Sequence, residues 1–533
     1  MKVWGIADQA TSAALQLDWL EREIEPVSEY GRRAFAALSA FAPGQEAAAA
    51  ARMQRVATLA RSVQNGSVER LRETLRAAPD VAAAIARAAA GDVLGDADFL
   101  ELQRFLDALA RAYEYSDDDE LDPDRPVVAR LREMLAPGRS GESGFYLADD
   151  YDPALAQARA VAARAQRLYD EVRGRIASRV AGRLGREEVA HEFIVMRDDL
   201  RGALPPEVRV IREAPTYLLC ELELDEGGLT ALASRDAASE RSARLEEELR
   251  ARLSRIVRAG APDLERLAQC FGHTDVLFAQ VDFAQRHSCV AAEIVPDSGL
   301  EFSEARFLPL AAELAREGRP YLPVSLKLPD VAVLTGPNMG GKSAALRTAG
   351  TIALLAAFGI PVPAKSARLP LFARIAWLGI GTESPAEGLL SSFAGEVRRL
   401  RDVLAASKER TLILLDEFAR TTTPGEGRAL LVAVVETLLE RRIAAFVATH
   451  LAGVAESAGV THFAIRGLRG VPHAPKNAHL HQVLAALAAS MDYSIVEISG
   501  DREPHADAIA LAELLGLDEG IISAARRALE SSG

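Results

Sequence analysis

The sequence predicts a multidomain protein with an α-helical first part, a small β-containing insertion within it, an α/β domain and a closing helical segment. Apolar residues recur at helical spacing from Leu15 to about Tyr115. Beyond about Tyr321, apolar β-type runs alternate with helical patterns, which is typical of a parallel sheet covered by helices. At 533 residues the chain is long enough for several domains. The domains that we expect are residues 1–150, 151–320, 321–470 and 471–533.

Composition indicates a globular protein of the cytoplasm. Apolar residues make up 49% of the chain and charged residues 26%. The formal net charge of −14 argues against a surface that binds nucleic acid all over, although it leaves room for a local basic patch. The three cysteines form no C-x-x-C pair, so we expect a reducing compartment and no structural zinc. Because the start is not basic and no run reaches about 18 apolar residues, we expect no membrane segment.

The first half contains signals for helices and for their ends. The bundle is interrupted at 42–44 and near Gly91, and solvated loops are expected at 116–126 and 137–141, on either side of a short helix. A long helix begins after Asp152-Pro153, with the aspartate as cap and proline at the first helical position, and runs to about Arg183.

A β-containing insertion follows this helix near residues 188–226. The runs that favour strands are 191–196, 208–211 and 217–224. A second long amphipathic stretch, from Ala237 to about His287, has charge pairs four residues apart. We expect the two long helices to pack antiparallel and to carry the insertion at their tip.

The best-defined motif lies between an apolar run and a helical pattern. The run Val331–Leu334 leads into G-x-x-x-x-G-K-S, which is the phosphate-loop pattern in a strand-loop-helix setting. Backbone N–H groups of such a loop surround phosphate oxygens, Lys342 reaches the β- and γ-phosphates, and Ser343 ligates Mg²⁺. We therefore predict ATP and Mg²⁺ as ligands. The nucleotide-binding residues are Gly336, Pro337, Asn338, Met339, Gly340, Gly341, Lys342 and Ser343.

Two later strands are expected to end at the same site. The apolar run from Thr411 ends in Asp416 and Glu417, which predicts that Asp416 holds Mg²⁺ and that Glu417 polarises the attacking water. A third strand, from Ala444, ends at His450, which we expect to contact the γ-phosphate or that water. Asp416 and Ser343 are thus the predicted metal ligands, and Glu417 and His450 the predicted catalytic residues.

Together these motifs resemble the MutS family of ABC-type ATPases. The loop centre Pro337-Asn338-Met339 is that family's own version of the phosphate loop. Further matching segments follow in the family's order: 361–364, 372–375, 391–396, 415–417, 448–450, 477–479 and 508–517. The resemblance implies a homodimer with composite sites, in which Asn338 approaches the γ-phosphate and Ser391 caps the nucleotide of the opposite subunit. It also implies core, lever and clamp regions before residue 330, and a dimerisation role for 471–533.

The chain departs from the family pattern in three respects. The core-like helices begin at once, so we expect neither the N-terminal mismatch-recognition domain nor mismatch reading. We likewise expect no C-terminal small MutS-related nuclease domain and no cutting of nucleic acid. The usual Gly-Arg-Gly-Thr-Ser-Thr after the acidic pair is replaced by Ala419–Pro424, which lacks both glycines and gains a proline, and this restricts a loop expected to cross the dimer interface.

The sequence leaves the partner open between DNA and a protein. DNA is favoured by arginines on the first long helix, three of which, Arg175, Arg179 and Arg183, share one face. The arginines of this basic strut are Arg159, Arg164, Arg167, Arg173, Arg175, Arg179, Arg183 and Arg186. They could equally be ordinary solvated residues of an exposed helix.

Two other functions compete with a DNA clamp. One is a protein-remodelling ATPase, such as a reactivating accessory factor of a cobalamin-dependent aminomutase, which the negative charge and the missing mismatch domain would suit. The other is a nucleotide-gated structural dimer with slow hydrolysis, against which Glu417 argues. We prefer the DNA interpretation because that use of the architecture is commoner, which is an analogy at the level of the fold.

Overall fold

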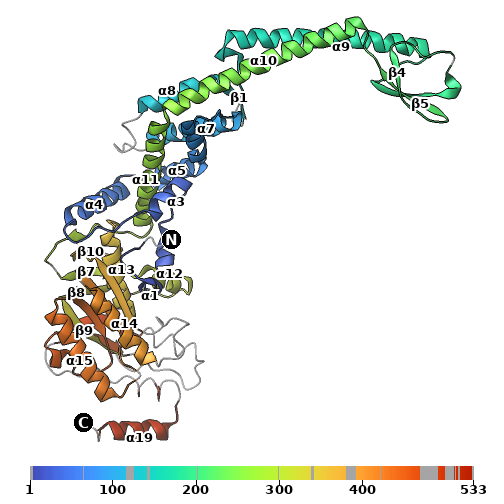
Figure 1. Ribbon diagram of the computed structural model, residues 1–533. Coiled ribbons are helices and arrows are strands. Elements are labelled where there is room, and N and C mark those ends of the chain that lie inside the picture. The colour runs from blue at the N-terminus through green and yellow to red at the C-terminus, as the bar shows by residue number, and fades with distance from the viewer. Residues whose placement is uncertain are drawn as a thin grey trace. The chain divides into compact units, whose positions relative to one another are not determined.

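The computed structural model divides the chain into two compact units, which are described separately (Figure 1). Unit 1 combines residues 1–76 with 271–533, and unit 2 is residues 77–270. The four domains expected from the sequence stay a proposal. The residues that the structure describes are 4–63, 65–115, 125–140, 144–200, 202–297, 299–337, 341–379, 392–407, 409–420, 422–468, 490–498, 509, 512–513 and 517–530.

Unit 1 is built on a six-stranded sheet in the order β11-β12-β13-β9-β14-β15. Five neighbouring strands are parallel and β15 pairs antiparallel with β14. All residues of β9 and β13 are buried, as expected for strands covered on both faces. The parallel sheet predicted beyond Tyr321 is therefore confirmed. The strands are β9 Val331–Thr335, β11 Arg374–Gly379, β12 Thr411–Asp416, β13 Ala444–Ala448, β14 Thr461–Leu468 and β15 Met491–Glu497.

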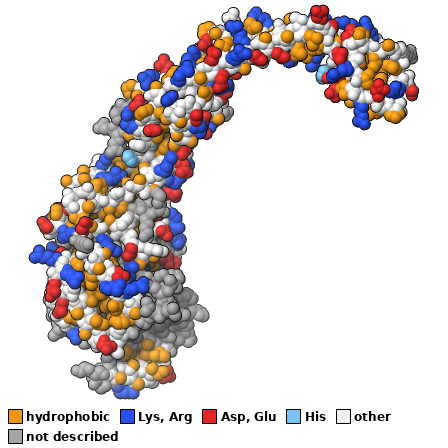
Figure 2. Space-filling model, in the orientation of Figure 1, with side chains coloured by type: hydrophobic (Ala, Val, Ile, Leu, Met, Phe, Trp, Pro, Cys, Tyr) orange, Lys and Arg blue, Asp and Glu red, His pale blue; other side chains and the backbone are white. Residues whose placement is uncertain are grey.

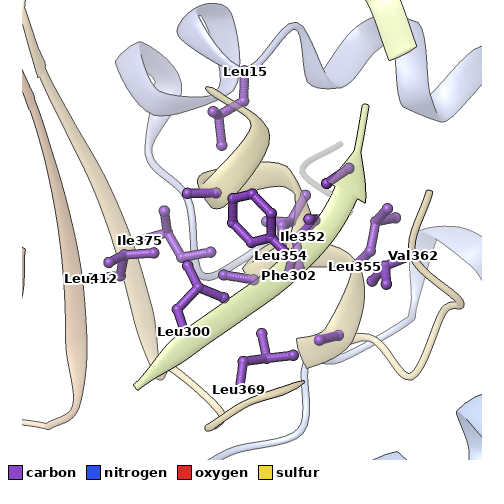
Figure 3. Packing of buried hydrophobic residues seen from close by; sticks show 14 of the residues in the cluster. Leu15, Leu300, Phe302, Ile352, Leu354, Leu355, Val362, Leu369, Ile375 and Leu412 are labelled. Atoms are coloured by element: carbon purple, nitrogen blue, oxygen red, sulfur yellow. The ribbon is translucent and has the colours of Figure 1, made fainter. Parts of the chain in front are cut away.

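Helices cover both faces of this sheet. One face packs α13 (Lys342–Ala357) into a core that includes Leu15, Ile375 and Leu412 (Figure 3). The other face packs against α15 (Pro424–Glu440) and α14 (Ser392–Ala406), with Leu431 and Leu400 among the buried contacts.

The N-terminal helices and a smaller sheet complete unit 1. Leu15, Leu17 and Leu20 enter the same core as α13. The small sheet has the order β6-β10-β7-β8 and was not predicted from the sequence. The remaining elements are α1 Gln9–Ala14, α2 Leu17–Glu23, α3 Glu29–Ala36, α4 Glu46–Ser62, α5 Asn65–Ala77, β6 Glu293–Ile294, β7 Leu300–Ala305, α12 Leu308–Arg316, β8 Val324–Leu328, β10 Ser366–Leu369, α16 Val454–Ala458 and α19 Glu519–Glu530.

Unit 2 contains two long helices that lie side by side (Figure 1). The chain runs out along α9 (Pro153–Leu184) and returns along α10 (Glu226–Ala259). Asp152 caps α9 by accepting a hydrogen bond from Ala154 N, which confirms the predicted start. The other elements are α6 Ala82–Ala90, α7 Asp96–Tyr115, α8 Arg125–Leu135, η1 Ala136–Gly138, β1 Arg139–Ser140, β2 Gly144–Phe145 and η2 Asp149–Tyr151.

The second long helix was predicted wrongly in two respects. It begins at Glu226 rather than near Ala237, and it ends at Ala259, after which α11 (Ala261–Arg286) begins. Gly260 separates the two helices and Pro262 lies in the first turn of α11, where a missing N–H costs nothing.

The predicted β-containing insertion is confirmed as a three-stranded antiparallel sheet, in the order β3-β5-β4, at the far end of α9 and α10 (Figure 1). Its inner face packs Phe193, Val195 and Cys220 against Val180 of α9. That α9 and α10 act as a lever and this sheet as a clamp stays a proposal. The strands are β3 Glu192–Met196, β4 Val208–Glu213 and β5 Tyr217–Leu222, with a 3-10 turn, η3, at Arg197–Asp199.

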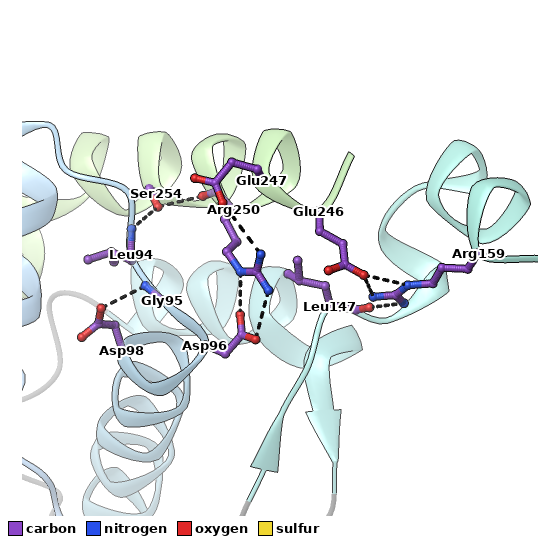
Figure 4. Close-up of polar contacts among 10 residues, drawn as sticks. All are labelled: Leu94, Gly95, Asp96, Asp98, Leu147, Arg159, Glu246, Glu247, Arg250 and Ser254. Carbon is purple, nitrogen blue, oxygen red and sulfur yellow. Dashed lines mark hydrogen bonds and ion pairs between the residues drawn. The ribbon is translucent and has the colours of Figure 1, made fainter. Parts of the chain in front are cut away.

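Charged contacts hold the base of α9 and α10 in unit 2 (Figure 4). Arg159 Nη2 donates to Glu246 Oε1 at 2.7 Å, which joins α9 to α10. Arg250 Nε donates to Asp96 Oδ1 at 3.0 Å, which joins α10 to α7.

No helix in the described ranges is both long and apolar enough to span a bilayer.

Candidate nucleotide site

The phosphate-loop motif lies between β9 and α13, at the carboxyl end of the sheet's parallel strands. Gly336 and Gly341 have φ angles of +151° and +89°, which residues with a Cβ rarely adopt. At Gly336 a Cβ would also lie 3.1 Å from the Cβ of Ile465. The strand and the helix predicted around the motif are thus both present. Asn338, Met339 and Gly340 lie outside the described residues.

Lys342 begins α13, and its ammonium group lies among oxygens. Nζ donates to Gly336 O at 2.7 Å and to Pro337 O at 3.3 Å, and lies 3.3 Å from Glu417 Oε1. Only 4% of the lysine side chain is exposed, so its charge requires such partners. Lys342 and Glu417, the first residue after β12, are therefore direct neighbours.

Asp416 and Ser343 meet as the sequence predicted. Ser343 Oγ donates to Asp416 Oδ2 at 2.7 Å. Burial raises the pKa of Asp416 and the neighbouring charge of Glu417 raises it further, while the bond from Ser343 lowers it. Its other oxygen, Oδ1, is buried and has no hydrogen-bond partner among the described residues.

These two side chains fit Mg²⁺. A buried carboxylate with an unpartnered oxygen, next to a hydroxyl and a second carboxylate, is a favourable environment for a hard divalent cation. Within the described ranges, no group of three or more His, Cys, Asp or Glu side chains could hold a metal.

Glu417 is surrounded by positively charged or titratable groups. Besides Lys342, Arg420 Nη1 lies 3.8 Å and His450 Nδ1 3.9 Å from Glu417 Oε2. The backbone N–H of Glu417 donates to Ala448 O at 2.9 Å, which ties the end of β12 to the end of β13. The structure thus brings together Lys342, Ser343, Asp416, Glu417 and His450, all of which the sequence singled out.

Comparison with known proteins decides the family. The family model for MutS domain V matches residues 332–531, the part that holds this site. This part of the chain belongs to the MutS family of ATPases. The family resemblance read from the sequence is thereby confirmed.

Curated relatives carry the name Endonuclease MutS2. The protein of Thermus thermophilus is 30% identical over 420 residues, which is 76% of this chain and 51% of that protein. That of Thermotoga maritima is 31% identical over 306 residues, 54% of this chain and 36% of its own length. That of Aquifex aeolicus is 36% identical over 211 residues, 38% of this chain and 27% of its own length. The chain therefore spans about half or less of these relatives.

The first residue of the segment that departs from the MutS pattern, Ala419, adopts a conformation suited to the glycine it replaces. Ala419 has a φ of +60°, in the left-handed region that favours glycine. Pro424 is the first residue of α15, where proline is favourable, so it stiffens a helix start. Thr421 lies outside the described residues, as does Ser391, the residue that the MutS resemblance assigns to the opposite subunit.

Sequence reasoning missed a hydrogen-bonded chain beneath the phosphate loop of this MutS-family domain. Thr335 Oγ1 lies 2.8 Å from His462 Nε2, and His462 Nδ1 lies 2.9 Å from Glu456 Oε1. Thr335 and His462 are both buried. The available signal was a histidine inside the apolar run that forms β14, where a polar side chain requires a partner.

Proposed function

We propose that this chain binds Mg-ATP at the loop 336–343 and hydrolyses it, as a MutS-type ATPase. The observation that carries the proposal is the Ser343–Asp416 pair with the unpartnered Asp416 Oδ1, beside Lys342 and Glu417. Phosphoryl transfer depends chiefly on positioning and charge stabilisation, and these groups supply both.

Each side chain has a distinct role in this proposal. Lys342 exchanges its backbone carbonyl partners for oxygens of the β- and γ-phosphates. Glu417 accepts a hydrogen bond from the attacking water and orients it, and His450 contacts that water or the γ-phosphate. Ser343 and Asp416 would hold Mg²⁺. When bound, the ion neutralises charge that develops on the phosphates.

We further propose that two copies form composite sites. On the resemblance, Asn338 approaches the γ-phosphate within a subunit, and Ser391 caps the nucleotide of the partner subunit. The segment 471–533 is the proposed dimerisation segment. ATP binding would then draw two copies together and couple hydrolysis to a change of shape in the dimer.

For the partner we propose DNA, bound without mismatch reading along the basic strut of α9. The structure sorts the arginines of that strut into two groups. Arg159, Arg179 and Arg183 form ion pairs with carboxylates of unit 2. The others include four exposed arginines for which the described part of unit 2 contains no ion pair: Arg164, Arg167, Arg173 and Arg175.

Those four exposed arginines support a local contact with phosphates. Positive and negative side chains are interspersed on the visible face of this region, so a contact would be local rather than extended (Figure 2). The name Endonuclease MutS2 favours nucleic acid over the aminomutase alternative. We do not extend cutting to this chain, because the match covers about half or less of those proteins.

The ATPase proposal is tested by substituting its charged residues. Lys342→Ala is expected to weaken ATP binding by roughly 100-fold, since it removes charge-assisted contacts of about 3 kcal/mol. Lys327→Ala, at an exposed position on β8, is the control and should bind ATP normally. Glu417→Gln should bind ATP, lose hydrolysis and accumulate as a dimer in size-exclusion chromatography. A Gln variant that hydrolyses at the normal rate would remove Glu417 from its role.

The DNA proposal is tested by salt-dependent titration. Wild type is titrated with duplex, single-stranded and branched DNA at two salt concentrations, with and without ATP. Arg164→Ala with Arg175→Ala should make the slope of log affinity against log salt less steep by about 2. A charge-matched control replaces Arg316 and Arg441, which are exposed in unit 1. Absence of binding at low salt would reject DNA as the partner.

A further inference from the structure

The turn after the acidic pair is held in a rare backbone conformation. Glu417 and Ala419 have φ angles of +56° and +60°, although neither is glycine. Residues with a Cβ persist in this region only where the surroundings over-determine it, and such positions concentrate at functional sites. The neighbours of residues 417–419 must therefore hold the turn in this conformation.

Helix α14 supplies two of those neighbours. Glu396 Oε2 accepts a hydrogen bond from Ala419 N at 2.9 Å. The ring of Phe393 lies 6.4 Å, centroid to centroid, from that of Phe418. Phe393 and Glu396 are three residues apart and so share one face of the helix. Ala419 and Phe418 are 3% and 5% exposed, so the contact with α14 is a buried one.

Helix α14 is itself anchored one turn further along. Arg399 Nε donates to Trp377 O of β11 at 3.0 Å. Its Nη2 donates to both carboxylate oxygens of Asp8, at 3.0 and 3.1 Å, and Asp8 caps α1. Glu396 therefore extends from a helix that is fixed to the sheet and to the N-terminal helices of unit 1.

We infer that Glu396 is a positioning residue, which holds the turn 417–419 and through it the Glu417 carboxylate in the place required for hydrolysis. The inference rests on the proposed role of Glu417 in ATP hydrolysis. It also links that carboxylate to the helix that follows Ser391, the residue proposed to contact the partner's nucleotide. Movement of α14 would thus change the position of Glu417 in the same subunit.

The decisive experiment compares Glu396→Ala with Glu396→Gln. Alanine removes the acceptor for Ala419 N, whereas glutamine retains an oxygen at the same reach. We expect kcat to fall about 10-fold in the alanine variant, with KM for ATP within about twofold of wild type, because the phosphate loop is untouched. Glutamine should restore kcat to within about twofold. The control is Glu436→Ala, at an exposed position on α15, which should behave as wild type.

A second readout does not depend on activity. Hydrogen exchange of peptides that span residues 415–420 should become faster in Glu396→Ala and stay slow in Glu396→Gln. If the wild-type protein hydrolyses no ATP, the proposed function fails. Hydrogen exchange still shows whether Glu396 holds the turn 417–419 in place. The inference would be overturned if Glu396→Ala kept both the wild-type kcat and the wild-type rate of hydrogen exchange. It would also be overturned if this variant lost ATP affinity by as large a factor as it lost kcat. Should the alanine variant not fold, Glu396→Asp, which withdraws the carboxylate by one methylene, is judged by the same criteria.

Discussion

The sheet of unit 1 and the long helices of unit 2 are stabilised in different ways. In β9 and β13 every residue is buried. In α9 only five of 32 residues are buried, and none of them lies between Ala158 and Ile176. The buried residues of α10 likewise leave a gap between Ala231 and Leu249. Apolar burial thus fixes the strands that carry the candidate nucleotide site, whereas helix caps, charge pairs and contacts at the two ends fix the helices.

The first prediction tests this contrast with one type of substitution in both regions. Leu414→Ala in β12 removes a fully buried side chain and should lower the free energy of unfolding by about 2–5 kcal/mol. Leu168→Ala in α9 removes a side chain that is 50% exposed and should change it by less than about 0.5 kcal/mol. Urea denaturation measures both. Equal losses of unfolding free energy in the two variants would show that Leu168, in the middle of α9, is packed against other side chains.

A second prediction concerns a polar joint in the buried region. Asp8→Ala should cost about 2 kcal/mol, because it removes the cap of α1 and leaves Arg399 without a carboxylate. Burial alone would raise the pKa of Asp8, but its bonds with Thr11 and the charge of Arg399 lower it below 3.8. The stabilisation is therefore present above pH 3.8 and lost as pH falls through the lower folded-state pKa.

The pH dependence of that joint can be isolated with Asp8→Asn, which can still cap a helix but carries no charge. The advantage of wild type over this variant should shrink as the solution is acidified. An advantage that stays constant down to low pH would mean that the pair with Arg399 contributes nothing.

In unit 2 the corresponding joint is the ion pair of Arg159. Arg159→Ala should cost about 1 kcal/mol, since it breaks the half-buried pair with Glu246 and a second pair with Asp149. Arg164→Ala, which removes an exposed arginine from the same helix, should be neutral within about 0.5 kcal/mol. Thermal unfolding followed by circular dichroism compares them. Identical effects would contradict the division of the strut into paired and unpaired arginines.

The smallest effect is expected at Ala419. A left-handed conformation costs a residue with a Cβ roughly 1–2 kcal/mol, and glycine loses roughly 0.5–1 kcal/mol more on folding, so Ala419→Gly should stabilise by about 0.5–1 kcal/mol. The same change at Ala433, within α15, should destabilise by about 1 kcal/mol. Chemical denaturation measures the change in the free energy of unfolding for both variants. A loss of stability in Ala419→Gly would contradict the claim that the backbone is strained at Ala419.

What the sequence could predict follows the same contrast between burial and polar contacts. Continuous apolar runs predicted β9, β12 and β13, and the pair Asp152-Pro153 predicted the start of α9. Each is a local signal, since a strand buried on both faces or a capped helix start is written in consecutive residues. The positions of Lys342, Asp416 and Glu417 followed because parallel strands end at one edge of the sheet.

Other features could not be read because they depend on residues far apart in the chain. The contact between Glu396 and Ala419 joins two elements 23 residues apart, and His462 pairs with Thr335 across 127 residues. The small sheet was missed although β8 and β10 alternate exposed and buried residues, because its strands are only two to six residues long and pair out of chain order, as β6-β10-β7-β8. The break between α10 and α11 did have a local signal, in Gly260 and Pro262. The regular charge pattern on either side nevertheless led to the prediction of one continuous helix.

The oxygen partners of Lys342 bear on which ligands the loop accepts. An ammonium group has three N–H donors, and the oxygens near this one include two backbone carbonyls and the Glu417 carboxylate of the described residues. An anion can bind the Lys342 ammonium group only by replacing those partners. The free energy of binding is therefore the difference between the contacts that the anion makes and the contacts that it displaces. A small monoanion offers too few oxygens to compensate, whereas a triphosphate offers several along its length. The loop would thus discriminate among anions through the number of contacts exchanged.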